Sequence, residues 1–383
     1  MPSTSIEVVN KFNELRLTAN TNSSVISNDK CDVSIATKAY AVYEPSDSFK
    51  LFEFERHISK STDVLIRIYY CGICHTDIHM ALNQWGYSKY PIVPGHEITG
   101  VVEQIGDNVK KFQVGDHVGV GYMINSCRTC HLCKRDLEQY CTNKCNTSNG
   151  TQIGQVTPTY GGYSNFIVVD EHFVSKIPKN LPLDSAAPLL CAGISTYSSL
   201  RYYNVGKNTR LGIIGLGGLG HIAIKLGSAM GAYVIVISSS ESKRNDALKL
   251  GANEFIVSKD EKQMKQIKNS LDLILDTVSA PHDVASLIDL LRFEGVYTII
   301  GAPSKSLEIP TFPLLMKRPI ISGSAVGGMK ETQEMLDFCG QHQITCDIEL
   351  IKATPEAIKT AFDRVIKADI KYRFVLDIIN AFK

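Results

Sequence analysis

The amino-acid sequence predicts an α/β protein with two parts, a β-rich, barrel-like domain followed by a doubly wound parallel sheet. Three observations predict this fold class. From residue 37 to about residue 180, short β-rich runs are separated by Gly, Pro and Asp, and helical pattern is sparse. From residue 210 onward, apolar strands alternate with amphipathic helices. At residues 210–220, a strand leads directly into a glycine-rich turn and a helix.

The first part contains five runs with the composition of β-strands. They are Lys38–Val42, Val64–Tyr70, Ile98–Ile105, His117–Val120 and Phe166–Val169. Residues 1–36 precede the ordered chain and are polar, rich in Asn, Ser and Thr. We therefore expect a flexible N-terminal extension, with order beginning near Thr37.

The second part alternates strands with helices, which predicts parallel strands joined by helical crossovers. The expected strands are Arg210–Ile214, Tyr233–Ile237, Glu254–Val257, Leu271–Asp276 and Val296–Ile300. The expected helices are Gly218–Met230, Asp246–Leu250, Leu287–Leu291, Glu331–Cys339 and Glu356–Lys367. The last apolar run, Tyr372–Ile378, is a strand that we expect to pair back with the first domain.

Composition and charge exclude several classes of protein. The 383 residues are 44% hydrophobic and 21% charged, which is typical of a globular chain. The net charge of +1 argues against a general affinity for nucleic acid or for an anionic membrane. The N-terminus lacks the basic and apolar segments of a signal peptide, and Leu211–Ile237 has the pattern of strand, turn and helix rather than of a membrane span. We expect a cytoplasmic protein.

Eleven cysteines, an odd number without a secretory signal, favour metal binding over a disulfide framework. Four of them, Cys127, Cys130, Cys133 and Cys141, fall within 15 residues. Four thiolates in one loop can close a tetrahedral shell around zinc with no open position, which indicates a structural metal. An iron–sulfur cluster is a lesser alternative. Cys145 is a second candidate for the fourth ligand, although the spacing favours Cys141.

A second set of candidate ligands is spread along the chain. It comprises Cys74, the pair His96 and Glu97, and Cys191. Two thiolates and an imidazole leave one position of a zinc ion free for a substrate oxygen. A free position makes zinc a Lewis acid that polarises a carbonyl or lowers the pKa of a bound alcohol.

The glycine-rich turn has the spacing of a dinucleotide site. It reads Gly215, Leu216, Gly217, Gly218, Leu219 and Gly220, between an expected strand and an expected helix. Glycines permit a tight turn and close approach of a pyrophosphate, and the helix N-terminus offers free N–H groups to it.

The end of the following strand indicates which dinucleotide binds. An Asp or Glu at this point would bind the ribose 2′-hydroxyl of NAD. This chain instead has Ser238, Ser239 and Ser240, followed by Lys243 and Arg244. Hydroxyl groups and cations suit a 2′-phosphate, so the sequence predicts NADP(H).

Together these motifs resemble the zinc-dependent medium-chain alcohol dehydrogenases, and within them the cinnamyl alcohol dehydrogenase-like branch. The resemblance covers roughly residues 37–380. It implies a GroES-like β-barrel catalytic domain over residues 37–190 and 330–383, a Rossmann NADP-binding domain over residues 191–329, and a homodimer.

The resemblance also implies roles for individual residues. Catalytic zinc would be held by Cys74, His96 and Cys191, with Glu97 next to the metal. Thr76 would contact the substrate oxygen and, with His79, would form a proton relay through the nicotinamide ribose. Asp77 would orient His96. The reaction would be reversible hydride transfer between NADPH and an aldehyde, with two zinc sites per chain.

The expected substrate pocket differs from that of the family's plant lignin enzymes. Those enzymes carry a Trp where this chain has Asn146, and a Phe where it has Ala325, with Val326 beside it. We expect Trp85 and Tyr87 to supply aromatic surface instead.

The predicted function is therefore an NADP(H)-dependent zinc alcohol dehydrogenase or aldehyde reductase for aromatic, allylic or medium-chain alcohols and aldehydes. The small-molecule substrate is its expected partner, besides a second copy of the chain. Two alternatives are a zinc-independent reductase of double or iminium bonds on the same scaffold, and a non-catalytic NADPH-binding protein.

Overall fold

The structure, a computed structural model, describes residues 33–153, 158–303 and 305–382. Residues 1–32, which carry most of the expected flexible extension, lie outside this range. The first strand begins at Val33, four residues before the expected start of order at Thr37. By their contacts, the described residues belong to one compact unit, which holds two large sheets.

The larger sheet is mostly antiparallel and has the strand order β16-β17-β3-β4-β5-β9, with β8 also paired to β3. Its strands are β3 (Asp63–Gly72), β4 (Ile98–Ile105), β5 (His117–Val120), β8 (Phe166–Asp170), β9 (Ser175–Lys176), β16 (Ile348–Lys352) and β17 (Arg373–Asp377). Two small sheets pair β1 (Val33–Ala41) with β2 (Lys50–Ile58), and β6 (Met123–Asn125) with β7 (Cys145–Asn146). The five strands expected in the first part are confirmed.

The C-terminal strand returns to the first domain, as expected. β17 pairs antiparallel with β3, so that Val375 lies opposite Gly72, and it pairs parallel with β16 on its other side. This return places the start of β17 beside the loop after β3, because the N–H of Ile73 donates to the carbonyl oxygen of Phe374 at 2.9 Å.

The second sheet is parallel throughout and has the order β12-β11-β10-β13-β14-β15. Its strands are β10 (Arg210–Ile214), β11 (Tyr233–Ser238), β12 (Glu254–Val257), β13 (Leu271–Asp276), β14 (Leu291–Ile299) and β15 (Ile320–Gly323). The doubly wound fold class is confirmed, since the strand order reverses at β10.

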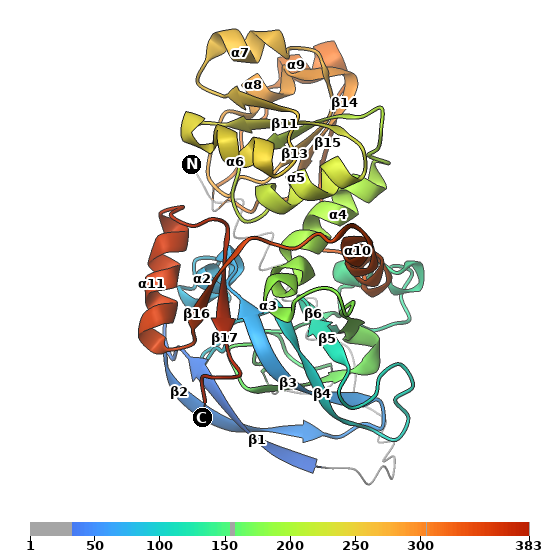
Figure 1. The fold of residues 1–383 in the computed structure, drawn as a ribbon, viewed down its shortest axis with the longest axis vertical. Coiled ribbons are helices and arrows are strands. Elements are labelled where there is room, and N and C mark those ends of the chain that lie inside the picture. The colour runs from blue at the N-terminus through green and yellow to red at the C-terminus, as the bar shows by residue number, and fades with distance from the viewer. Residues whose placement is uncertain (1–32, 154–157, 304, 383) are drawn as a thin grey trace, which may run out of the picture. The chain divides into compact units, whose positions relative to one another are not determined.

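Helices cover both faces of this sheet, as Figure 1 shows. Alternate residues of each strand explain why. Leu211 and Ile213 of β10 join the core beneath α5 and α6, whereas Ile214 faces the opposite core with α8. Because both faces are buried, the strands read as continuous apolar runs in the sequence.

The helices vary in length from one turn to about four turns. They are α2 (His75–Ala81), α3 (Leu183–Ala186), α4 (Ala192–Tyr202), α5 (Gly220–Ala229), α6 (Arg244–Lys249), α7 (Glu261–Gln266), α8 (Val284–Ile288), α9 (Thr311–Lys317), α10 (Met329–His342) and α11 (Pro355–Ile366). The helix expected at Leu287–Leu291 is wrong in position. The helix starts earlier, because the side chain of Asp283 accepts hydrogen bonds from the N–H groups of Ala285 and Ser286. Leu291 is not helical, because it begins β14 and pairs there with Leu271 of β13.

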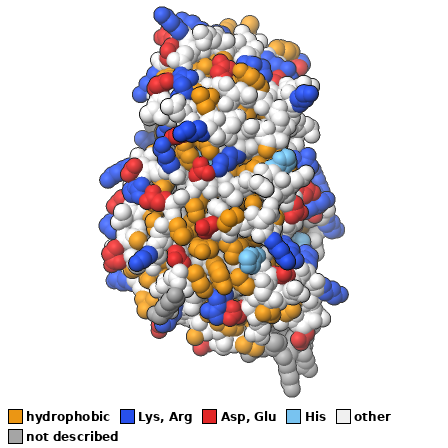
Figure 2. Space-filling view, in the orientation of Figure 1, with side chains coloured by type: hydrophobic (Ala, Val, Ile, Leu, Met, Phe, Trp, Pro, Cys, Tyr) orange, Lys and Arg blue, Asp and Glu red, His pale blue; other side chains and the backbone are white. Residues whose placement is uncertain are grey.

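Charged side chains of both signs are interspersed over the face shown in Figure 2. This distribution agrees with the net charge of +1. Within the described residues, the structure has no helix that combines the length and the apolar composition needed to cross a membrane.

Candidate functional site

Four candidate ligands from distant parts of the sequence meet at one point. One donor atom from each of Cys74, His96, Glu97 and Cys191 lies within 4.8 Å of the others. Cys74 immediately precedes α2 and Cys191 immediately precedes α4, while His96 and Glu97 lead into β4. The N-terminal ends of α2 and α4 and the start of β4 thus bring these four side chains into one buried space.

The spacing of these donors fits a zinc ion. Cys74 Sγ lies 3.9 Å from Cys191 Sγ, and His96 Nε2 lies 3.3 Å from Cys191 Sγ. A tetrahedral zinc with Zn–S bonds of about 2.3 Å holds its sulfur ligands about 3.8 Å apart. Two sulfurs and an imidazole nitrogen are also the donors that zinc prefers.

The charge distribution suits a cation at the same point. A hydrogen bond from Cys191, with Arg373 and His96 nearby, holds the pKa of Cys74 well below its usual range. The pKa of Cys191 is raised well above its usual range by its hydrogen bond with Cys74, by burial and by repulsion between the two thiolates. A divalent metal removes this conflict, since it stabilises both thiolates.

Glu97 lies against the cluster with one oxygen free. Its Oε1 accepts a hydrogen bond from Arg373 Nη2 at 2.5 Å, whereas its Oε2 is buried and has no partner among the described residues. Burial raises the pKa of Glu97 to about 8, although Arg373 opposes this shift. An unpaired buried carboxylate oxygen beside three zinc donors is consistent with a carboxylate next to the metal.

Asp77 connects the two ligand loops. Its Oδ2 accepts from the N–H of Cys74 at 2.9 Å, and its Oδ1 accepts from the N–H of Gly95 at 2.9 Å. The same Oδ1 lies 3.2 Å from His96 Nδ1. Asp77 therefore favours a proton on Nδ1, which leaves Nε2 of His96 unprotonated and facing the sulfurs.

Thr76 and His79 both lie on α2, one helical turn apart, with Thr76 half-buried and His79 buried. His79 Nδ1 lies 2.5 Å from Gln84 Oε1, and its Nε2 is buried without a partner among the described residues. An amide oxygen can only accept, so Gln84 fixes the tautomer with Nδ1 protonated and Nε2 ready to accept a proton. Sequence reasoning missed Gln84, because a polar residue in a loop carries no pattern of its own.

Arg373 is a second residue that sequence reasoning missed. Besides Glu97, its Nη1 lies 3.5 Å from the carbonyl oxygen of Ile73. A Cβ placed on Gly218 would lie 3.1 Å from the Arg373 side chain. Arg373 therefore bridges the ligand cluster and the glycine-rich turn. The only sequence signal was an arginine at the start of an otherwise apolar strand.

The glycine-rich turn has the shape that its sequence predicts. Gly215 has a φ of +87°, a conformation that glycine adopts without strain. A Cβ on Gly220 would lie 2.2 Å from the carbonyl oxygen of Gly215, so the turn cannot close with a larger residue. In contrast, a Cβ on Gly217 would meet nothing within 4 Å, which leaves open space above the turn. Gly217 is also exposed, so the backbone of the turn is open there to the approach of a pyrophosphate.

The expected phosphate selector lies next to this turn. Ser238 ends β11, and Lys243 Nζ donates to the carbonyl oxygen of Leu216 at 2.9 Å. Arg244 is engaged elsewhere, because it pairs with Glu241 at 2.5 Å and donates to the carbonyl oxygen of Phe255 at 2.7 Å. Of the two cations, Lys243 is therefore the one held against the glycine-rich turn.

The four cysteines of the loop also converge. The Sγ atoms of Cys127 and Cys133 lie 3.9 Å apart, those of Cys130 and Cys133 3.6 Å, and those of Cys141 and Cys127 3.5 Å. These distances again match a tetrahedral shell around zinc. Cys145 is not part of this group, since its Sγ lies 3.7 Å from the carbonyl oxygen of Asn146.

The residues expected in the substrate pocket fall into two places. Trp85 stacks on His79 with ring centroids 4.6 Å apart, and Tyr87 stacks on Trp85 at 5.9 Å. These two aromatic rings therefore extend outward from His79. Val326 is partly buried and packs on the core that contains Ile194 of α4.

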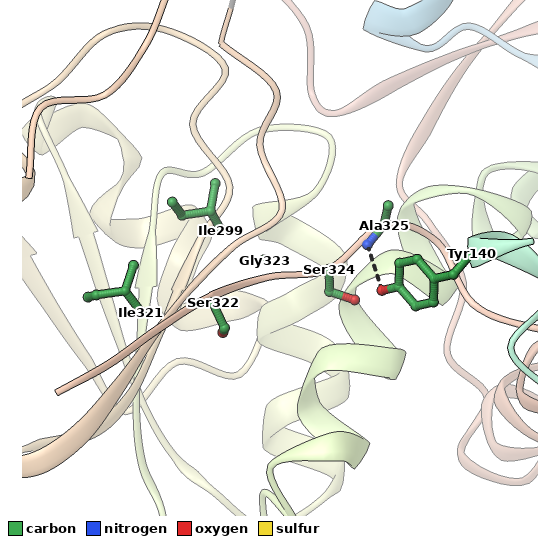
Figure 3. Close-up of a pocket in the computed structure, with 7 residues that line it drawn as sticks. All are labelled: Tyr140, Ile299, Ile321, Ser322, Gly323, Ser324 and Ala325. Carbon is green, nitrogen blue, oxygen red and sulfur yellow. Dashed lines mark hydrogen bonds between the residues drawn. The ribbon is translucent and has the colours of Figure 1, made fainter. Parts of the chain in front are cut away.

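Ala325 lines a cavity of about 540 Å³, which Figure 3 shows. The other lining residues are Tyr140, Ile299, Ile321, Ser322, Gly323 and Ser324. The N–H of Ala325 lies 3.5 Å from the hydroxyl oxygen of Tyr140, which belongs to the four-cysteine loop. Trp85 and Tyr87 do not line this cavity.

Comparisons with known proteins agree with this geometry. The model of the alcohol dehydrogenase GroES-like domain matches residues 60–179, and that of the zinc-binding dehydrogenase matches residues 218–341. The chain is 52% identical to 8-hydroxygeraniol dehydrogenase of Catharanthus roseus over 90% of its own length and 95% of that protein. It is 53% identical to cinnamyl alcohol dehydrogenase 2 of Rauvolfia serpentina, with the same coverage.

Solved structures give the same result. A cinnamyl alcohol dehydrogenase from Sorghum bicolor superposes with a TM-score of 0.87 at 44% identity, covering 91% of this chain and 99% of that one. CAD from Helicobacter pylori in complex with NADP(H) superposes with a TM-score of 0.85 at 40% identity, covering 91% and 100%.

Proposed function

The chain belongs to the alcohol dehydrogenase family that combines a GroES-like domain with a zinc-binding dehydrogenase domain, in its cinnamyl alcohol dehydrogenase-like branch, and from this premise we propose that it is an NADP(H)-dependent zinc enzyme. It interconverts primary alcohols and aldehydes of the aromatic, allylic or medium-chain classes. The observation that carries the proposal is the convergence of Cys74, His96 and Cys191 beside a dinucleotide-type turn. The two alternatives, a zinc-independent reductase and a non-catalytic binding protein, are not favoured by the relatives.

Each proposed ligand has a distinct contribution. Cys74, His96 and Cys191 would hold the catalytic zinc, and Asp77 keeps His96 turned toward it. When bound, zinc supplies a Lewis acid that lowers the pKa of an alcohol and polarises a carbonyl. Glu97, with one free oxygen, lies where it can approach the metal.

Two residues of α2 take part in the proposed proton relay. We assign Thr76 to the substrate hydroxyl and His79 Nε2 to the far end of the relay, because that nitrogen is buried and has no partner among the described residues. Gln84 holds the opposite ring nitrogen protonated. During alcohol oxidation His79 accepts the proton, and during aldehyde reduction it returns it. When bound, NADP(H) would supply the hydride donor or acceptor for this reaction.

The residues after β11 support NADP(H) as the cofactor. Residues 238–240 are serines, so the Asp or Glu that would bind the ribose of NAD is missing from these three positions. Lys243 lies against the glycine-rich turn. We propose that the serine hydroxyls and Lys243 bind the 2′-phosphate. The relative of known structure from Helicobacter pylori was solved with NADP(H).

A second zinc in the four-cysteine loop is structural in our proposal. We also propose that residues 37–190 and 330–383 form the catalytic domain and residues 191–329 the cofactor domain. The strand membership of the two sheets supports these limits, because β16 and β17 join the first sheet while β10 to β15 form the second.

We propose that the protein is a homodimer in the cytosol. β15 is an edge strand, and the neighbouring α9 exposes Phe312, Leu315 and Met316 by 64–73%. An apolar surface beside an open strand edge is typical of a surface that another chain covers. None of the ten cysteines that the structure describes forms a disulfide bond, which suits a reducing compartment. Light scattering should give about twice the chain mass of 42.2 kDa.

An activity screen tests the proposed function. The purified zinc-loaded enzyme should oxidise NADPH in the presence of aromatic, allylic or medium-chain aldehydes, and should use NADH poorly. Turnover should stop when a strong chelator removes the metal and return when zinc is added. Turnover that is insensitive to the chelator, or tight NADPH binding without turnover of any aldehyde, would overturn the proposal.

A further inference from the structure

Tyr122 and Asn146 are neighbours beside the proposed metal site, and neither side chain takes part in the proposed proton relay or zinc binding. Tyr122 directly precedes β6, and Asn146 ends β7, where it pairs with Met123. The N–H of Thr147 donates to the carbonyl oxygen of Tyr122 at 2.9 Å. The short β6–β7 ladder therefore fixes the two side chains next to each other.

The ring of Tyr122 lies against a proposed metal ligand. Its centroid is 5.8 Å from that of His96, and the two rings meet edge to face at 87°. The phenolic O–H of Tyr122 is a hydrogen-bond donor.

Asn146 offers the complementary group. Its Oδ1 is buried and has no hydrogen-bond partner among the described residues. A buried amide oxygen without a partner costs free energy unless a ligand pairs with it. The two side chains thus present one O–H donor and one free acceptor. A hydroxyl group, which both accepts and donates, satisfies them together.

We propose that Tyr122 and Asn146 form a hydroxyl-binding subsite, so that the enzyme prefers alcohols and aldehydes carrying a second hydroxyl group remote from the reacting carbon. This inference rests on the proposed function and names the substrate class within it. The substrate hydroxyl accepts from Tyr122 Oη and donates to Asn146 Oδ1. Trp85 and Tyr87, stacked outward from His79, provide an apolar wall for the intervening carbon chain.

The test compares primary alcohols with diols of equal length. We would measure kcat/KM with NADP⁺ for 1-butanol to 1-decanol and for the matching α,ω-diols, using the zinc-loaded enzyme. Each diol value is halved because a diol has two reactive ends. At the chain length that reaches the subsite, the diol should be preferred by about 10- to 100-fold, as expected for two hydrogen bonds lost by the analogue.

Variants locate the source of the preference. Tyr122→Phe removes the donor and Asn146→Leu removes the acceptor, and each should reduce the diol preference at least fivefold. The ratio is measured within one variant, so a general loss of stability or activity does not affect it. Tyr202→Phe changes a tyrosine on α4 that is 77% exposed and should leave the ratio as it is.

The outcomes separate this inference from the proposed function. If the enzyme oxidises no alcohol, the proposed function fails. If it oxidises mono-alcohols and diols equally at every chain length, the proposed function holds and the hydroxyl subsite is wrong. A diol preference that survives in both Tyr122→Phe and Asn146→Leu also overturns the subsite, since the preference then comes from other residues. Where a variant fails to fold, the wild-type ratio decides.

Discussion

At the scale of single residues, the candidate site depends on polar side chains that fix the orientation of its two histidines. Asp77 holds His96 through Nδ1, and Gln84 holds His79 in the same way. Both contacts leave Nε2 of the histidine available for its proposed role, which is zinc binding in His96 and proton transfer in His79. The proposed metal ligands were predictable because they stand in motifs. Gln84 and Arg373 were not, because their roles arise only from neighbours distant in the fold.

The first prediction concerns the relay. Gln84→Ala should lower kcat for alcohol oxidation about tenfold, because His79 loses its fixed orientation and tautomer. Gln84→Glu should keep the orientation but raise the pKa of His79, since a carboxylate stabilises the protonated ring. The pH–rate profile of Gln84→Glu should then move to higher pH. Gln341→Ala, at an exposed position of α10, is the control. Unchanged kcat and profile in both Gln84 variants would refute the positioning role.

The second prediction concerns acid stability. His221 is fully buried, with its ring stacked on Tyr372 at 5.0 Å, and burial lowers its pKa from 6.5 to about 3. The unfolded chain therefore takes up a proton first, so stability is complete above pH 6.5 and is lost as the pH falls toward 3. Between pH 7 and pH 5 this histidine should cost about 2 kcal/mol.

Urea unfolding measures this cost. The free energy of unfolding of the wild type and of His221→Phe is compared at pH 7 and pH 5. The variant, whose ring can still stack on Tyr372, should lose about 2 kcal/mol less over this interval. Equal losses in the two proteins would show that His221 does not set the acid limit.

At the scale of elements, the turn between β10 and α5 and the end of β11 together form the proposed cofactor site. Both were predictable, since a strand, a glycine pattern and a helix succeed one another in the sequence. Helix α4 was not predicted, because Ala192–Tyr202 is rich in Ser and Thr and lacks a clear apolar period. Its position matters nonetheless, since it carries Cys191 at its start.

The third prediction concerns cofactor choice. Ser239 lies just after β11 and is exposed, so an aspartate there would repel a 2′-phosphate and accept a bond from a ribose hydroxyl. Ser239→Asp should lower kcat/KM for NADPH by roughly 10- to 1000-fold relative to NADH. Ser34→Asp, which adds the same charge on β1, should leave the ratio unchanged. If the ratio persists in Ser239→Asp, the selector lies elsewhere.

The fourth prediction concerns the four-cysteine loop. This loop carries Glu138, which is buried and accepts from the N–H of Met329 at the start of α10 and lies 3.0 Å from His172 Nε2. Cys141→Ser should remove one zinc per chain and lower the melting temperature, since the loop then no longer holds Glu138 beneath α10. Cys145→Ser should keep both metals. Elemental analysis measures the zinc content of each variant, and calorimetry measures its melting temperature. Loss of zinc from Cys145→Ser but not from Cys141→Ser would show that Cys145, not Cys141, is the fourth ligand.

At the scale of the whole molecule, the return of β17 to β3 matters most. It places Arg373 between Glu97 and Gly218, and so connects the candidate ligand cluster with the glycine-rich turn. The sequence predicted that the last strand pairs back but not what its first residue contacts, because that contact joins segments 276 residues apart. The fold class and both ligand sets were thus accessible from sequence, whereas the connection between them required the fold.

The central claim is that zinc, held by Cys74, His96 and Cys191, faces the bound cofactor. Crystals of the protein grown with NADPH should be measured just above and just below the zinc absorption edge. The account predicts two anomalous peaks per chain, one among the four loop cysteines and one among those three side chains, within reach of the nicotinamide ring. A single peak at the loop, with the other three donors empty, would contradict it.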